Sequence, residues 1–107
     1  QPESSAASDV YKRQIPENIK WSAEDGGVTN QDVKALILST WDFDKKETLK
    51  IDLWTKDMPL DHMNIFIYQT LVSLSKTHLR STNNEKIFKD FSDFCDYFAE
   101  KLDLKKN

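Results

Sequence analysis

The hydrophobic pattern changes its period inside one short stretch, residues 51–69, which reads IDLWTKDMPLDHMNIFIYQ. Up to Lys56 apolar residues recur at every second position, the period of a strand with one buried face. Beyond Pro59 they recur every third or fourth position, the period of an α-helix. Proline disfavours helical geometry in the residue before it and suits the first helical position. The sequence therefore predicts a strand followed by a helix that starts at Pro59.

Two carboxylates, Asp57 and Asp61, flank this junction. With Met58 as N-cap, Asp61 is the third helical residue, where a carboxylate meets unpaired backbone N–H groups and the positive end of the helix dipole. Asp57 is expected to accept a further N–H from just outside the helix. The alternative hypothesis is a carboxylate-based enzyme, which requires both side chains to converge on a pocket. Because helix capping accounts for both carboxylates, no enzymatic activity is expected.

Alternation also predicts a strand over residues 15–23 and a second strand over residues 48–56. Between them, residues 29–42 have apolar side chains at helical spacing and predict a short helix, capped by Thr29 or Asn30. Trp21 and Trp41 lie on the apolar stripes of these elements and are expected in the core. The charged stretch FDKKE then links the short helix to the second strand.

Two long helices follow. The first extends from Pro59 to about Arg80, and a T-x-x-E capping box from Thr82 to Glu85 predicts the start of the second. The fold class is therefore α+β, with one short and two long helices packed on one face of a small antiparallel sheet. Two strands alone are marginally stable, so a third strand is expected to be missing or supplied by another chain.

Residues 1–14, QPESSAASDVYKRQ, have no periodicity and contain only Val10 and Tyr11 as sizeable apolar groups. Such a segment cannot bury enough surface to offset its ordering entropy, so it is expected to be disordered. The run SSAASDVYKRQ also resembles a translated sequencing adapter, and we interpret residues 1–14 as non-native; the alternative is a genuine flexible tail. Residues 15–107 are expected to form a single α+β domain.

Composition narrows the class of partner and the compartment. The formal net charge of −3, without a cluster of basic and aromatic residues, argues against nucleic acid. No stretch approaches the ~18 consecutive apolar residues of a membrane span, and the start lacks an apolar secretory signal. A single cysteine, Cys95, fits a reducing compartment. The expected location is the cytoplasm, without membrane insertion.

Metal and cofactor chemistry is not expected. His62 and His78 lie too far apart on one helix for the i, i+4 spacing of a shared metal ion. Cys95 falls on an apolar stripe and is interpreted as a small buried hydrophobe. No nucleotide-binding or hydrolase motif occurs in the chain.

Two surfaces are candidates for binding another protein. Trp54 lies on the polar side of its strand, where a large aromatic side chain needs a contact that covers it, and forms a predicted interaction patch with Lys50, Asp52 and Lys56. The alternative is that Trp54 packs on a neighbouring strand or on the predicted short helix. The last helix has an acidic ridge that could bind a cation or a basic partner, although a solvated helix face is the usual explanation. This ridge consists of Asp90, Asp93, Asp96 and Glu100.

The stretches IPENIKWSAEDGG, KALILSTWD, TLKIDLWTKDMPLDHM and DFCDYFAEKLDL together resemble the gliding-motility-associated protein GldC family. The resemblance extends from about Ile15 to Lys106. It implies a role in surface gliding, whose machinery is linked to protein secretion, and it implies no reaction and no catalytic residues. Family members have a strand ahead of the position of Ile15, where this chain has the adapter-like segment.

The expected function is therefore that of a non-catalytic accessory protein that binds a protein partner of the gliding or secretion machinery. The alternative is a small oligomeric holdase or an adaptor for secretion-linked proteins, suggested by the open strand edges and the acidic ridge. If an open sheet edge pairs between chains, a homo-oligomer is expected.

Overall fold

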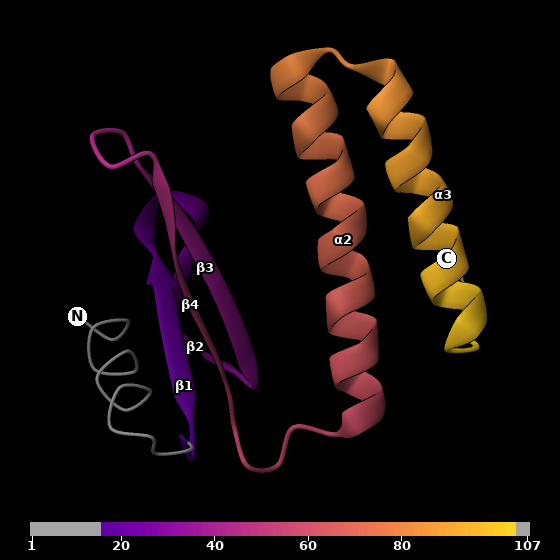
Figure 1. The fold of residues 1–107 in the computed structure, drawn as a ribbon. Coiled ribbons are helices and arrows are strands. Elements are labelled where there is room, and N and C mark those ends of the chain that lie inside the picture. Colours follow the sequence, from indigo (N-terminus) through magenta and orange to yellow (C-terminus); the bar gives the residue numbers. More distant parts are fainter. Residues whose placement is uncertain (1–15, 105–107) are drawn as a thin grey trace. The chain divides into compact units, whose positions relative to one another are not determined.

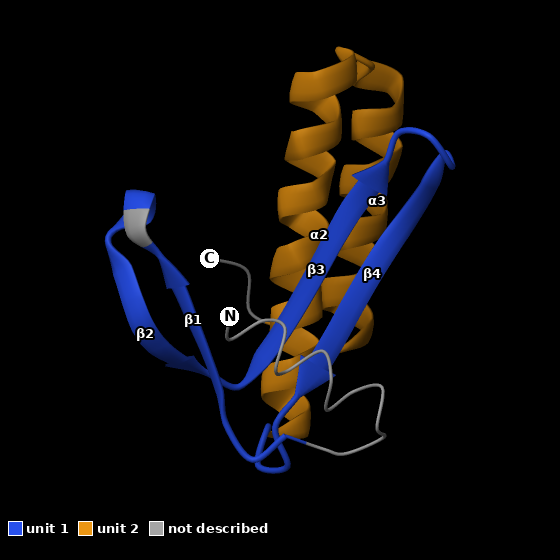
Figure 2. Cartoon of the chain, turned by 90° about the vertical axis from the view of Figure 1, so that its left-hand side faces the viewer, with its two compact units in different colours: residues 1–58 blue, residues 59–107 orange. Residues whose placement is uncertain are grey.

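A computed structural model of the chain describes residues 16–104, without the side chain of Glu24. Contacts divide the chain into two compact units, one ending at Met58 and one beginning at Pro59 (Figure 2). The first unit holds the strands and the second holds the long helices. The expectation for residues 1–14 lies outside the described residues, and that of a single domain over residues 15–107 stays a prediction.

The first unit contains four strands joined as two antiparallel pairs (Figure 1). Strands β1 (Ile19–Ala23) and β2 (Val28–Val33) form one pair, with the 3-10 turn η1 (Glu24–Gly26) between them. Strands β3 (Ala35–Asp42) and β4 (Glu47–Trp54) form the other. The α+β class is confirmed. The expected single sheet with two visible strands is wrong, since the described residues form two sheets of two strands.

The short helix predicted over residues 29–42 is also wrong, because β2 and β3 occupy this stretch. Apolar spacing there matches a helix, but the run ALILSTWD pairs residue by residue with β4, from Ala35 opposite Trp54 to Asp42 opposite Glu47. Cross-strand contacts between aliphatic, β-branched and aromatic side chains stabilise this arrangement over the local helix. As a consequence, Trp41 is 62% exposed and does not belong to the core.

A tight turn joins β3 to β4. The Asp42 carboxylate accepts hydrogen bonds from the backbone N–H groups of Asp44 and Lys45, both at 3.1 Å, and the Lys46 N–H donates to the Asp42 carbonyl at 2.9 Å. Lys46 takes the left-handed conformation with φ 55°. An aspartate that bonds to the backbone two and three residues ahead is a common turn former. The charged FDKKE stretch is therefore the turn of a hairpin.

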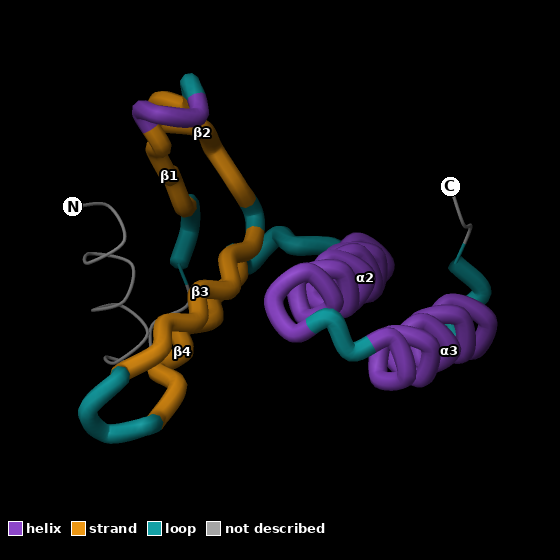
Figure 3. Tube along the Cα trace, turned by 90° about the horizontal axis from the view of Figure 1, so that it is seen from above, coloured by secondary structure: helices purple, strands orange, loops and turns teal. Residues whose placement is uncertain are grey.

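The second unit consists of two helices that lie side by side, α2 (Leu60–Thr82) and α3 (Glu85–Lys101), shown in Figure 3. The prediction of two long helices is confirmed, while their starts differ from those expected. Pro59 is the N-cap of α2, with ψ 144°, so the helix begins one residue later and Asp61 is its second residue. Asn84 caps α3 by accepting the Ile87 N–H at 3.1 Å.

The capping box expected from Thr82 to Glu85 is therefore wrong. Thr82 lies in the last turn of α2, where its hydroxyl donates to the His78 carbonyl at 2.7 Å. Asn83 reverses the chain with a left-handed φ of 58° before α3 starts. A single hydrogen bond accepted by the Asn84 side chain thus provides the capping that the T-x-x-E pattern suggested for two side chains.

Small buried residues mark the contact between α2 and α3. Ala99 is fully buried, and Cys95 and Ser75 are 4% and 3% exposed. Small side chains at such positions let two helices approach closely. The rings of Tyr68 and Phe98 stack across the pair with centroids 6.5 Å apart. The expected packing of both long helices on a sheet face stays a prediction.

Candidate functional site

The β3–β4 hairpin has two distinct faces. Side chains alternate along a strand, so one face displays Lys50, Asp52 and Trp54 of β4 together with Ala35 and Ile37, which lie opposite Trp54 and Asp52 on β3. The side chains of Lys50 and Asp52 form an ion pair. Trp54 is 51% exposed, which confirms the exposure expected from the sequence.

Lys56, the fourth residue of the predicted patch, lies just beyond the end of β4. Its Nζ forms an ion pair with Glu17 Oε1 at 3.3 Å, and its backbone N–H donates to the Pro16 carbonyl at 3.3 Å. The structure thus brings Lys50, Asp52 and Trp54 onto one face. Lys56 is engaged with the segment that precedes β1. The role of the patch in binding stays a prediction.

The turn end of the hairpin carries exposed apolar side chains that were not among the predicted site residues. Their exposed fractions range from 56% to 83%; the residues are Trp41, Phe43 and Leu49. A sequence signal for the strand was present, because the continuous apolar run ALIL is consistent with a strand as well as with a helix. It was missed because the same residues also satisfy a helical spacing.

The opposite end of the hairpin is closed by a polar cluster. The buried Thr55 donates its hydroxyl to Asp57 Oδ1 at 2.6 Å, and Lys34 Nζ lies 2.7 Å from Asp57 Oδ2. The Thr55 backbone N–H also donates to the Lys34 carbonyl at 2.9 Å. The hydrogen bond from Lys34, followed by that from Thr55, holds the pKa of the Asp57 carboxyl below its ordinary value.

These contacts correct the expected role of Asp57. Its hydrogen bonds go to Lys34 and Thr55 within the first unit and not to the start of α2. Asp61 accepts the His62 N–H at 3.1 Å, near the start of the helix as expected. The two carboxylates therefore have separate local partners.

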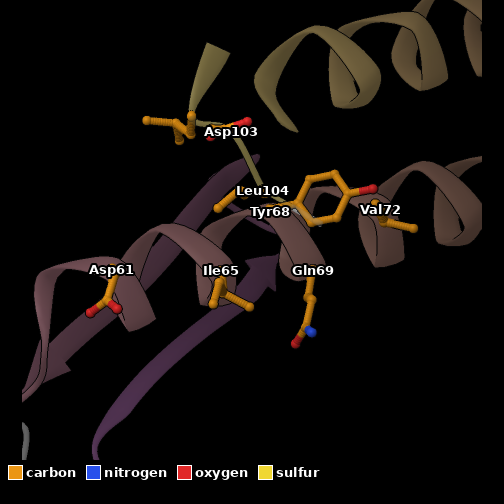
Figure 4. Close-up of a pocket in the computed structure, with 8 residues that line it drawn as sticks. Asp61, Ile65, Tyr68, Gln69, Val72, Asp103 and Leu104 are labelled. Carbon is orange, nitrogen blue, oxygen red and sulfur yellow. The ribbon is translucent and has the colours of Figure 1, made fainter. Parts of the chain in front are cut away.

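The helix pair contains a pocket of about 540 Å³ that the sequence did not predict (Figure 4). One wall is a face of α2, and the other is the chain that turns back after α3, held by the hydrogen bond from the Leu104 N–H to the Ala99 carbonyl at 2.8 Å. Two carboxylates stand among mostly apolar side chains. The lining residues are Asp61, Ile65, Tyr68, Gln69, Val72, Leu102, Asp103 and Leu104.

Asp57 does not line this pocket. Spacing alone places Asp61, Ile65, Tyr68 and Val72 on one face of α2, so that wall was readable from the sequence. The second wall depends on the reversal after α3, where Asp103 takes a left-handed φ of 56°. No residue pattern in that stretch marks such a reversal.

The remaining candidate residues occupy ordinary positions. Cys95 is buried, as expected, and burial followed by the charge of Asp96 raises the pKa of its thiol. Thr82 Oγ1 lies 3.4 Å from His78 Nδ1. Within residues 16–104, no three His, Cys, Asp or Glu side chains are grouped so as to hold a metal ion.

The acidic ridge lies exposed along α3, as its spacing predicted, and comprises Asp90, Asp93, Asp96 and Glu100. Lys89 forms an ion pair with Asp93 at 3.0 Å, and this contact raises the pKa of the lysine. Each of these groups is well hydrated, so the pairs contribute little to stability. Binding of a cation or a basic partner by the ridge stays a prediction.

The family model described as gliding motility-associated protein GldC-like matches residues 16–104. The chain belongs to the GldC-like family. The match includes all four strands and both long helices, and it associates this GldC-like chain with gliding motility. Searches of curated proteins and of solved structures found no match. In the described part of this GldC-like chain, neither α2 nor α3 is long and apolar enough to cross a membrane.

Proposed function

We propose that this GldC-like chain is a non-catalytic accessory protein of the gliding machinery that binds a protein partner in the cytoplasm through the Trp54 face of the β3–β4 hairpin. The observation that carries the proposal is the half-exposed Trp54 beside the Lys50–Asp52 ion pair. A large aromatic side chain flanked by charged groups is a common centre of protein interfaces.

The position of Trp54 is well fixed for such a contact. The next residue, Thr55, is 1% exposed and bonds through both its backbone and its side chain to the cluster with Lys34 and Asp57. A binding residue supported by a buried and hydrogen-bonded neighbour loses little conformational freedom when a partner docks. The free energy of burying the indole is therefore available for affinity.

The same cluster supports a non-catalytic role. Both carboxylate oxygens of Asp57 are engaged, and the pKa of that carboxyl lies below its ordinary value. A general base needs a pKa near the working pH and an oxygen free to reach the substrate. Asp57 is poorly suited to that task.

Trp54→Ala tests the proposal, with Leu49→Ala as the matched control. Leu49 lies on the opposite face of β4 and is likewise exposed. The tagged variants are produced in a gliding bacterium that lacks its own copy, and both gliding and co-purified machinery components are measured. Removing a central interface tryptophan is expected to weaken partner binding at least ~30-fold and to impair gliding. A folded Trp54→Ala protein that retains its partners and supports gliding contradicts the proposal.

A second candidate function, a holdase for export-bound chains, is favoured by the exposed apolar residues at the turn end of the hairpin. Unfolded clients bind to such surfaces because they bury apolar area without a fixed geometry. Suppression of aggregation of a chemically unfolded client at stoichiometric amounts tests this candidate, with a Trp41→Ser/Phe43→Ser double variant as comparison. No suppression by the unmodified chain removes the candidate.

A further inference from the structure

The outer edge of β4 is open in the described part of the chain. β4 pairs with β3 along one edge, and within residues 16–104 no strand pairs with the other edge. An open edge presents a row of unpaired backbone N–H and C=O groups that can pair with another strand. The question is which strand matches it.

The hydrogen bonds of the hairpin show which backbone groups face outward. The Thr55 N–H points inward, that is, toward the β3 side, where it donates to the Lys34 carbonyl at 2.9 Å. This bond agrees with the register that places Trp54 opposite Ala35. In an antiparallel pair, alternate residues direct both backbone groups to the same side. Ile51, like Thr55, therefore bonds inward, and the residues with outward groups are Thr48, Lys50, Asp52 and Trp54.

This alternation limits how two β4 strands can pair edge to edge, because an outward residue must face another outward residue. A register centred on Lys50 places two lysines opposite each other, and one centred on Asp52 does the same with two aspartates. A register centred on Ile51 places each Lys50 opposite the Asp52 of the second copy. Opposite charges directly across strands stabilise the pair, whereas like charges destabilise it.

We infer that two copies of the chain form a dimer through antiparallel pairing of their β4 edges, with Ile51 at the two-fold axis. The same register places Leu49 opposite Leu53 and Thr48 opposite Trp54 of the second copy. Both hairpins then join in one sheet of β3, β4, β4 and β3. This dimer goes beyond the proposed function and does not depend on it, since edge pairing uses backbone groups and leaves the Trp54 face open.

A competing occupant of this edge is the chain's own N-terminal segment. The Lys56 N–H, which has the outward orientation, donates to the Pro16 carbonyl at 3.3 Å, so Pro16 lies beside the same edge. Amide hydrogen exchange separates the two occupants. Dimer formation makes the protection of the Lys50 and Asp52 amides depend on protein concentration. Protection that is the same at every concentration overturns the inference.

Charge reversal tests the register in the full-length chain. Lys50→Asp places like charges opposite each other at two symmetric positions, and Asp52→Lys does the same with lysines. The double variant Lys50→Asp/Asp52→Lys restores opposite charges. Light scattering over a range of concentrations should show a dimer for the unmodified chain, about tenfold weaker dimerisation for each single variant and recovery in the double variant. An unmodified chain that stays monomeric, or a double variant no better than the singles, overturns the inference.

A cross-link tests the two-fold axis directly. In this register the two Ile51 residues form a pair without backbone hydrogen bonds, where Cα atoms lie ~4.5 Å apart, within the range of a disulfide. Ile51→Cys is therefore expected to form a covalent dimer under air oxidation. Leu49→Cys faces Leu53 of the second copy and is the matched control, expected to stay uncross-linked. Cross-linking of Leu49→Cys in preference to Ile51→Cys rejects the register.

Discussion

The Nζ of Lys34 lies 2.7 Å from Oδ2 of Asp57, and this ion pair joins the residue before β3 to the chain just after β4. Thr55 donates to the other carboxylate oxygen, so the cluster fastens the open end of the hairpin. At the other end, Asp42 organises the turn through two backbone N–H groups. One carboxylate at each end thus fixes the length of the β3–β4 pairing.

The ion pair predicts a defined dependence of stability on pH. The folded protein holds the pKa of Asp57 below its ordinary value of 3.8, so the folded state favours the ionised carboxylate. This stabilisation is complete above pH 3.8, and it is lost as the pH falls through the lower pKa that Asp57 has in the folded state. Asp57→Asn should therefore reduce the free energy of unfolding at neutral pH, and its difference from the unmodified chain should shrink in acid.

Urea unfolding at neutral pH and at about pH 3 measures both quantities. Asp44→Asn is the matched control, since it also removes one exposed carboxylate but lies in the turn at the far end of the hairpin. A difference between Asp57→Asn and the unmodified chain that is constant across this pH range would contradict the assignment of the pKa.

The turn at Asp42 predicts a second stability effect. Asp42→Ala removes the acceptor of two backbone hydrogen bonds and should lower the free energy of unfolding by about 1 kcal/mol. Asp44→Ala is the control: Asp44 takes part in the turn through its backbone N–H, which the substitution keeps, and loses only its side-chain carboxylate. Thermal unfolding followed by circular dichroism compares the two variants, and equal losses would show that the turn does not depend on the Asp42 side chain.

Burial of Cys95 predicts slow thiol chemistry. The side chain is 4% exposed, and burial, followed by the charge of Asp96, raises the pKa of the thiol, so little of the reactive thiolate forms at neutral pH. Alkylation by iodoacetamide should be at least about tenfold slower in the native chain than in urea. A Ser81→Cys/Cys95→Ala variant carries an exposed thiol on α2 and should react at similar rates in both solvents. Equal rates for native and unfolded Cys95 would overturn this prediction.

The elements predicted well from the sequence are those with long and regular periods. α2 and α3 extend over many helical turns, and their expected starts were wrong by only one to three residues. The error is small because moving the N-cap to a neighbouring residue changes the free energy of the helix only slightly. β4 was expected over residues 48–56 and forms at Glu47–Trp54. Strict alternation with β-branched and aliphatic residues left no other interpretation there.

The stretch from Val28 to Asp42 was predicted wrongly because its apolar residues are consistent with two kinds of element. Val33, Leu36, Ile37 and Trp41 fit one helix face, and the continuous apolar run from Ala35 to Leu38 is also consistent with a strand. Pairing with β4 decides between them, and this is a contact between segments that local spacing does not encode. The aspartate that opens the DFDKKE stretch was the available sign of a turn.

Among the candidate site residues, the exposure of Trp54 and of the acidic ridge followed directly from alternation and helical spacing. The partners of Asp57 did not, because Lys34 is distant in the sequence and meets it only once the hairpin forms. The pocket on α2 escaped prediction for a similar reason, since Leu104 reaches it only through the reversal after α3.

The order of pairing also bears on how the chain folds. β1 with β2, β3 with β4 and α2 with α3 each join elements that follow one another directly along the chain, so each pair closes only a short loop. Such neighbour-to-neighbour connectivity gives folding times on the order of milliseconds or less. During synthesis, each hairpin can therefore assemble soon after its second element leaves the ribosome, before the remaining residues are made.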